Sequence, residues 1–334
     1  IAFRMTGELN TTPSGLSEGI LWDSKKGGVA EDLLDFYGFS SDLIPAVVPN
    51  FSVQGVVTAE AAEALKVPSG TPVSYRAGDQ PNNALSLNVL EPGELATTAG
   101  TSGVVYGIVD APAYDPQSRV NPFVHVNHSE ERPRYGVLMC LNGTGILNRW
   151  LRETVCGPEG STVGYEEVNE IAAQSPPGAE GLMVFPYGNG AERTLKNLDL
   201  GASLTNINFN LHGPPHLYRA GQEGIVYALN YGIGIMREMG MDIRTVKAGY
   251  ANMFLSPLFR EVFATVTGAT VELYSTDGAQ GAARGAGIGS GIFGDFETAF
   301  QGLDLKAVVE PDKGGMERYA ELYSGWVREL ENRI

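Results

Sequence analysis

Short apolar strands alternate with helical patterns through the second half of the chain, and this order narrows the choice of fold. Apolar runs at residues 243–248 and 269–274 are expected to be strands. A helix beginning at Ser256-Pro257 follows the first run, and a Gly/Ala-rich helix over residues 278–294 follows the second. Such alternation is typical of sheets covered by helices. The sequence therefore predicts an α/β fold.

Two apolar runs nearer the middle of the chain predict a β-hairpin. Residues 95–99 and 104–109 flank Gly100-Thr101-Ser102-Gly103, which would form its tip. Glycines let backbone amides approach phosphate oxygens, and the hydroxyls add further donors, so this tip is suited to holding a phosphate. An ordinary hairpin turn has the same residue pattern, and the two interpretations stay open.

A second small-residue segment lies between a predicted strand and a predicted helix. Asn142-Gly143-Thr144-Gly145 follows the strand expected at residues 135–141 and precedes a helix that runs through Trp150. The free amides at the start of a helix attract anions, so this junction is another candidate phosphate contact.

Asp79 follows a strand predicted at residues 72–77 and precedes a helix predicted at residues 82–89. A carboxylate there can serve as a helix cap or an Asx-turn residue. Beside phosphate-binding loops, it can instead accept the proton of a sugar hydroxyl that attacks a γ-phosphate. Further along, Ala248-Gly249-Tyr250-Ala251-Asn252 either seats a purine with help from Asn252 or forms a simple turn.

Composition excludes several classes of protein. The 23 basic and 39 acidic residues give a net charge of −16, which disfavours nucleic acid as a partner. Apolar runs stay well short of the roughly 20 residues that a membrane-spanning helix needs. Two cysteines, Cys140 and Cys156, make no disulfide framework, and a reducing, cytoplasmic compartment is expected.

Two motif matches are given structural interpretations. The G-x-G-x-x-G pattern at residues 289–294 lies late in a helix rather than after a strand, so it indicates helix packing, not dinucleotide binding. His212 and His216 have helical metal-ligand spacing, but two prolines stand between them, and no metal ligand is assigned.

The motifs around Asp79, the hairpin tip and Asn252, taken in their order along the chain, resemble those of the FGGY carbohydrate kinase family, most closely its xylulose kinases. Residues 77–79 resemble the family's Gly-Gly-Asp-Asn stretch, and residues 98–103 resemble its Gly-Thr-Ser phosphate hairpin. Residues 218–228 resemble its second signature helix, and residues 248–252 its adenosine motif. The resemblance covers essentially the whole chain but only the later part of the family, whose members begin with a D-x-G-T phosphate hairpin.

The resemblance implies an actin-like ATPase fold, also described as ribonuclease-H-like, with two domains that close over ATP and sugar. Residues 1–90 would end the first, sugar-binding domain, and residues 91–334 would form the complete second, ATP-binding domain. Asp79 would be the base and would contact the sugar together with Gln80. The implied ATP-binding residues are Gly100, Thr101, Ser102 and Gly145 at the phosphates, and Gly249 and Asn252 near adenosine. Mg²⁺ would bridge the phosphates.

This sequence departs from the family pattern at three places. Gln80 stands where the family often has Asn, and Lys247-Ala248-Gly249 replaces the usual double glycine. Glu192-Arg193-Thr194 resembles a Gly-Glu-Arg-Thr-Pro stretch but is flanked by Ala191 and Leu195.

The expected activity is transfer of the ATP γ-phosphoryl group to a pentulose, with D-xylulose to D-xylulose 5-phosphate as the specific expectation. The 334-residue chain is expected to be inactive alone, and a homodimer is a family-level expectation. Two alternatives stay open: a kinase for another acceptor, such as ribulose, gluconate or glycerol, and a non-catalytic actin-like nucleotide-binding module.

Overall fold

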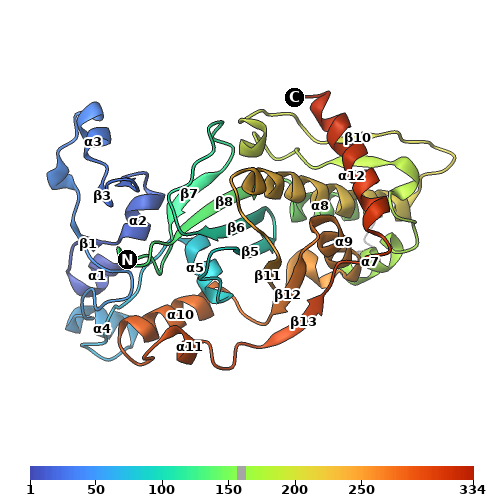
Figure 1. The fold of residues 1–334 in the computed structure, drawn as a ribbon. Coiled ribbons are helices and arrows are strands. Elements are labelled where there is room, and N and C mark those ends of the chain that lie inside the picture. Colours follow the sequence, from blue (N-terminus) through green and yellow to red (C-terminus); the bar gives the residue numbers. More distant parts are fainter. Residues whose placement is uncertain (156–162) are drawn as a thin grey trace.

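The computed structural model of the chain describes residues 1–155 and 163–334, and a mixed sheet lies at its centre (Figure 1). The described residues form seven strands in this sheet, in the order β13-β12-β11-β5-β6-β8-β7. In chain order they are β5 (Glu94–Ala99), β6 (Gly103–Val109), β7 (Asn121–Val124), β8 (Tyr135–Leu141), β11 (Thr245–Gly249), β12 (Thr270–Tyr274) and β13 (Leu305–Val309). β11 is parallel to β5 and β12, and the remaining neighbours are antiparallel. The predicted α/β class is confirmed.

The predicted hairpin is formed by β5 and β6, with Ala99 paired to Gly103 across the tip. Successive residues of these strands point to opposite faces of the sheet. Leu95 and Val105 join the core on one face, while Ala96 and Val104 join the core on the other. Both faces of the hairpin are therefore covered, which fixes its tip rigidly at the edge of the sheet.

Helices cover the two faces of the sheet. α8 (Pro214–Glu238) and α9 (Pro257–Thr267) lie on one side, and α5 (Asp79–Ser86) and α10 (Gly278–Gly289) lie on the other (Figure 1). Glycines interrupt α8 because it packs closely: a Cβ on Gly224 would lie 2.2 Å from the carbonyl oxygen of Val184. Ser256 caps α9 by accepting a hydrogen bond from the amide of Phe259, as its sequence predicts.

The remaining elements lie around this sandwich. The N-terminal elements gather at one end of the sheet, where β1 pairs with β4 and β2 pairs with β3 (Figure 1). Thr58 caps α4 by accepting a hydrogen bond from the amide of Ala61. The elements are α1 (Ala2–Thr6), β1 (Asn10–Thr11), α2 (Pro13–Glu18), β2 (Trp22–Asp23), β3 (Gly28–Val29), α3 (Glu31–Tyr37), β4 (Ala46–Val47), α4 (Ala59–Leu65), α6 (Gly145–Val155), α7 (Tyr165–Ala172), β9 (Met183–Phe185), β10 (Ser203–Thr205), α11 (Phe296–Ala299) and α12 (Met316–Glu331).

Two local expectations were wrong. Residues 72–77 form no strand within this described stretch, because they meet their neighbours only at the single bridges Phe51–Tyr75 and Val56–Pro72. α5 begins at Asp79 rather than at residue 82. β7 has no clear strand signal in the sequence, because one of its four residues is a proline.

The helix predicted over residues 278–294 ends at Gly289, so only the first residue of the G-x-G-x-x-G match lies in α10. A Cβ on Gly289 would lie 1.8 Å from the carbonyl oxygen of Ser74, which is a packing contact, whereas a Cβ on Gly291 or Gly294 would meet nothing within 4 Å. Among the helices that lie within residues 1–155 and 163–334, none combines the length and apolar character needed to cross a bilayer. Cys140 is a free thiol, and Cys156 lies outside the described residues.

Candidate active site

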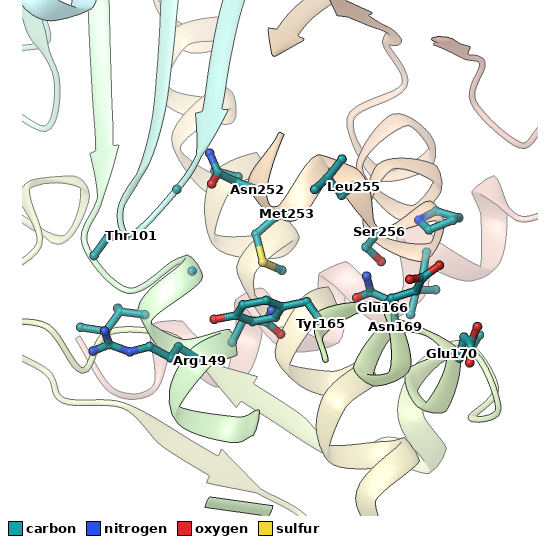
Figure 2. Close-up of a pocket in the computed structure, with 18 residues that line it drawn as sticks. Thr101, Arg149, Tyr165, Glu166, Asn169, Glu170, Asn252, Met253, Leu255 and Ser256 are labelled. Atoms are coloured by element: carbon teal, nitrogen blue, oxygen red, sulfur yellow. The ribbon is translucent and has the colours of Figure 1, made fainter. Parts of the chain in front are cut away.

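A cavity of about 820 Å³ opens beside the tip of the β5–β6 hairpin (Figure 2). Four of the residues expected to bind ATP line it: Gly100, Thr101, Gly145 and Asn252. They come from three separate parts of the chain, so the tertiary structure brings them together. The described lining does not include Ser102, which follows Thr101, or Gly249, which lies three residues before Asn252.

The two small-residue segments meet at one wall of this cavity. The amide of Gly145 donates to the carbonyl of Gly100 at 2.7 Å, and the amide of Ile146 donates to the carbonyl of Thr101 at 3.2 Å. A Cβ on Gly145 would lie 2.4 Å from the Gly100 oxygen, so only glycine allows this approach. The start of α6 and the hairpin tip therefore form one continuous backbone surface facing the cavity.

Asn252 closes the opposite side of the hairpin tip. Its backbone lies in the left-handed region, with φ of 54°, a conformation that Asn tolerates better than most residues. This turn places the Asn252 side chain beside Gly100, where an added Cβ would lie 3.7 Å from Asn252 Nδ2. Gly249 lies instead at the end of β11, where its nearest neighbour is the carbonyl of Thr276.

The far wall of the cavity was not foreseen from the sequence. Tyr165, Glu166, Asn169 and Glu170 on α7 line it together with Arg149 on α6, and Figure 2 shows Tyr165 and Met253 pointing into the cavity. Arg152 stacks 4.3 Å from the centre of the Tyr165 ring, which holds the tyrosine in place. The signal that could have found this wall is the amphipathic pattern of residues 165–172, which was not assigned to a helix.

Buried hydrogen bonds fix this wall to the rest of the site. Gln222 on α8 donates to Asn169 at 3.0 Å and accepts from Ser256 at 2.9 Å. Asn169 and Ser256 both line the cavity, so one buried amide sets the distance between α7 and the start of α9. Met253, Leu255 and Leu258 add an apolar surface on which a flat ring could lie.

Asp79 is the exposed first residue of α5 and lies outside the lining of this cavity. Gln80 donates to its carboxylate at 3.1 Å. The carboxyl of Glu18 lies against Gly78, the residue before Asp79, because a Cβ on Gly78 would overlap it. Burial, together with the negative charge of Asp79, raises the pKa of Glu18 to about 7. Sequence reasoning missed Glu18, since nothing near residue 18 points to Asp79.

Cys140, near the end of β8, connects the region of Asp79 with that of the hairpin. Burial and the charge of Glu192 raise the pKa of the Cys140 thiol. A hydrogen bond with Ser102 lowers it, and the charge of Asp79 raises it further. Ser102 and Asp79 therefore both influence the pKa of the same thiol.

The described side chains offer no prepared metal centre. Within the part of the chain that the structure describes, no three His, Cys, Asp or Glu side chains gather closely enough to hold an ion. His216 instead accepts a hydrogen bond from the amide of Gly213 at the start of α8. A Mg²⁺ ion is thus not assigned to any residue of this chain.

The sequence profile of the FGGY family of carbohydrate kinases, C-terminal domain, matches residues 95–289. The chain belongs to the FGGY family. The match begins at the hairpin and ends with α10, so it contains every residue that lines the cavity. The FGGY kinases have the actin-like ATPase fold, and the predicted fold is therefore confirmed.

Two curated FGGY relatives and one solved structure are similar to this chain. Xylulose kinase from Bacillus subtilis (strain 168) is 26% identical over 97% of this chain and 63% of its own length. Gluconokinase from the same strain is 28% identical over 64% of this chain and 40% of its own length. The crystal structure of xylulose kinase from Rhodospirillum rubrum gives a TM-score of 0.86 at 26% identity, covering 99% of this chain and 66% of that one. The chain thus spans less than two thirds of these relatives.

Proposed function

We propose that this chain is the nucleotide-binding and acceptor-activating part of an ATP-dependent sugar kinase. In this proposal, residues 1–90 end a sugar-binding domain and residues 91–334 form the ATP-binding domain. The observation that carries it is the meeting of Gly100, Gly145 and Asn252 around one cavity. These residues were singled out separately along the sequence, and a nucleotide site requires them together.

Nucleotide binding follows from the lining of the cavity. Phosphate oxygens would accept hydrogen bonds from the backbone amides of the hairpin tip. The first amides of α6 already donate to the carbonyls of Gly100 and Thr101, so α6 would contribute through its dipole, which favours negative charge. The purine would lie on the apolar surface formed by Met253, Leu255 and Leu258, with Asn252 within reach of it. Arg149 supplies a positive charge at the same cavity in a strongly acidic protein.

Phosphoryl transfer would then need one proton acceptor. A sugar hydroxyl oxygen attacks the γ-phosphorus, the bond from that phosphorus to the β-phosphate oxygen breaks, and the hydroxyl proton passes to Asp79. Gln80 holds the Asp79 carboxylate by its hydrogen bond. Mg²⁺ would supply charge neutralisation on the phosphates, and no residue of this chain is assigned to hold it.

The proposed acceptor is a pentulose, with D-xylulose as the specific candidate. Xylulose kinase from Bacillus subtilis (strain 168) matches 97% of this chain at 26% identity, which supports this candidate. Autoinducer-2 kinase from Escherichia coli matches 100% of the chain at the same identity, so the acceptor has to be measured. Gluconate, ribulose and glycerol are the competing acceptors. A panel of ketoses, polyols and gluconate, assayed with ATP and the full-length protein, decides among them by kcat/KM.

Replacement of Asp79 tests the proposed chemistry. Asp79→Asn should lower kcat by about 10²–10⁴, because the general base is lost, and should leave the affinity for MgATP unchanged. Asp295→Asn is the matched control, since Asp295 is also a carboxylate at a helix N-terminus and lies far along the chain at α11. If Asp79→Asn turned over at the wild-type rate, Asp79 would not be the general base. MgATP binding without transfer to any acceptor would favour a non-catalytic nucleotide-binding module.

A further inference from the structure

A buried carboxyl group, that of Glu192, lies against the small-residue segment at residues 142–145 and has no part in the function proposed above. Glu192 is fully buried, at 0% exposure. Its Oε1 accepts a hydrogen bond from the amide of Asn142 at 2.9 Å. Its other oxygen is also buried and has no hydrogen-bond partner among the described residues. Burying a carboxyl oxygen without a hydrogen-bond partner costs folding free energy, so this group needs an explanation.

The segment that carries Glu192 encloses residues 142–143 from one side. Asn142 Nδ2 donates to the carbonyl of Ala191 at 3.0 Å, and Asn189 Nδ2 donates to the carbonyl of Asn142 at 3.1 Å. A Cβ on Gly143 would lie 1.5 Å from the carbonyl oxygen of Pro186. Residues 186–192 therefore hold the backbone of Asn142 and Gly143 at several points.

The same segment contacts the nucleotide cavity on its other side. Gly145 and Ile146 donate their amides to the hairpin tip at Gly100 and Thr101. Asn142 is only three residues from Gly145, which lines the cavity, so a displacement of Asn142 would also move the backbone of the cavity wall. Glu192 is connected to the phosphate contacts by one hydrogen bond and this short, tightly packed stretch of chain.

The charge state of Glu192 falls in the neutral range. Burial raises its pKa to about 7, although the neighbouring amides of Asn142 and Gly143 favour the ionised form. The titratable groups that face it are Cys140 on β8 and Tyr187 after β9, and its charge raises the pKa of both. Both are uncharged near pH 7, so Glu192 is the group in this cluster that changes charge there. An amide binds a carboxylate more strongly than a neutral carboxyl group.

We propose that Glu192 is a positioning residue that holds residues 142–145 in the geometry that binds the nucleotide phosphates. The inference rests on the proposed function and deepens it, because it assigns Glu192 a task in nucleotide affinity. In the proposed function the acceptor sugar is bound by Asp79 and Gln80, not by Glu192.

Replacements of Glu192 test the inference in MgATP titrations of the full-length protein, with the KM of the acceptor measured in parallel. Glu192→Ala removes the anchor and should weaken MgATP binding about tenfold, the loss of roughly 1.4 kcal/mol of positioning, with acceptor KM within twofold. Glu192→Gln keeps an acceptor for the Asn142 amide but cannot ionise. It should match the wild type at pH 6 and bind several-fold more weakly at pH 8.

Asp23→Asn is the matched control. Asp23 also accepts two successive backbone amides, from Lys25 and Lys26, but it lies in the N-terminal elements away from the cavity. This variant should bind MgATP like the wild type at both pH values. If Glu192→Ala does not fold, the isosteric Gln variant alone decides the question.

Two results would overturn the inference while leaving the kinase proposal intact. One is a folded Glu192→Gln variant that binds MgATP like the wild type at pH 6 and pH 8. The other is a Glu192→Ala variant whose MgATP affinity and acceptor KM change in parallel, which indicates a general structural role. A wild-type protein that binds no MgATP would instead refute the proposed function, and this inference with it.

Discussion

Replacing Gly145 by alanine tests whether contact between the two small-residue segments builds the site. An added Cβ would lie 2.4 Å from the carbonyl oxygen of Gly100 and 3.0 Å from its carbon. Carbon and oxygen normally approach to about 3.3 Å, so the segments must separate by roughly 1 Å. The hydrogen bond of 2.7 Å between Gly145 and Gly100 would then be stretched or lost.

The cost follows from these distances. Forcing a methyl group into a packed contact costs about 1–3 kcal/mol, and weakening one hydrogen bond adds about 1 kcal/mol. Gly145 is the first residue of α6, so little helix propensity is regained. We expect the free energy of unfolding to fall by about 2 kcal/mol. A displacement of about 1 Å at a phosphate contact can also reduce turnover up to 10²-fold.

Urea denaturation and MgATP titration measure the two effects. Gly234→Ala is the control, because the Cβ that it adds near the end of α8 would meet no described atom within 4 Å other than its chain neighbours and its own helix backbone. Alanine there should stabilise the protein by up to about 1 kcal/mol. The reasoning is refuted if Gly145→Ala unfolds at the wild-type urea concentration and binds MgATP with unchanged affinity.

Two further predictions concern buried charge. The pKa of Glu18 is raised to about 7, so the native state holds a proton that the unfolded state releases, and stability is lost as pH rises from about 5 towards 8. Glu18→Gln should remove this loss, which is worth about 1 kcal/mol because the side chain is only partly buried. Urea midpoints that keep the wild-type pH dependence would contradict this prediction. Arg219 pairs with Glu223 at 2.8 Å inside the protein, and Arg219→Met should cost about 3–5 kcal/mol by leaving that carboxylate unpaired. The double variant Arg219→Met with Glu223→Leu should recover part of the lost free energy of unfolding in the same denaturation assay. If the losses of the two single variants simply add in the double variant, the pairing is refuted.

Local patterns sufficed for the elements that short-range forces fix. The hairpin at residues 94–109 followed from two apolar runs around four small residues, and the helix start at Ser256 followed from a hydroxyl residue before a proline. The strand predicted at residues 72–77 failed because a strand needs a continuous partner. Its neighbours at residues 51 and 56 meet it only through single bridges.

The sequence by itself determined the alternation of strands and helices, the positions of two phosphate-type turns and the family resemblance, since each depends on neighbouring residues. Only the tertiary structure decided that Gly145 lies on Gly100, that α7 walls the cavity, and that Glu18 and Glu192 lie beside Asp79 and Asn142. These contacts join residues from 45 to 61 positions apart, and side-chain packing rather than local hydrogen bonding selects them.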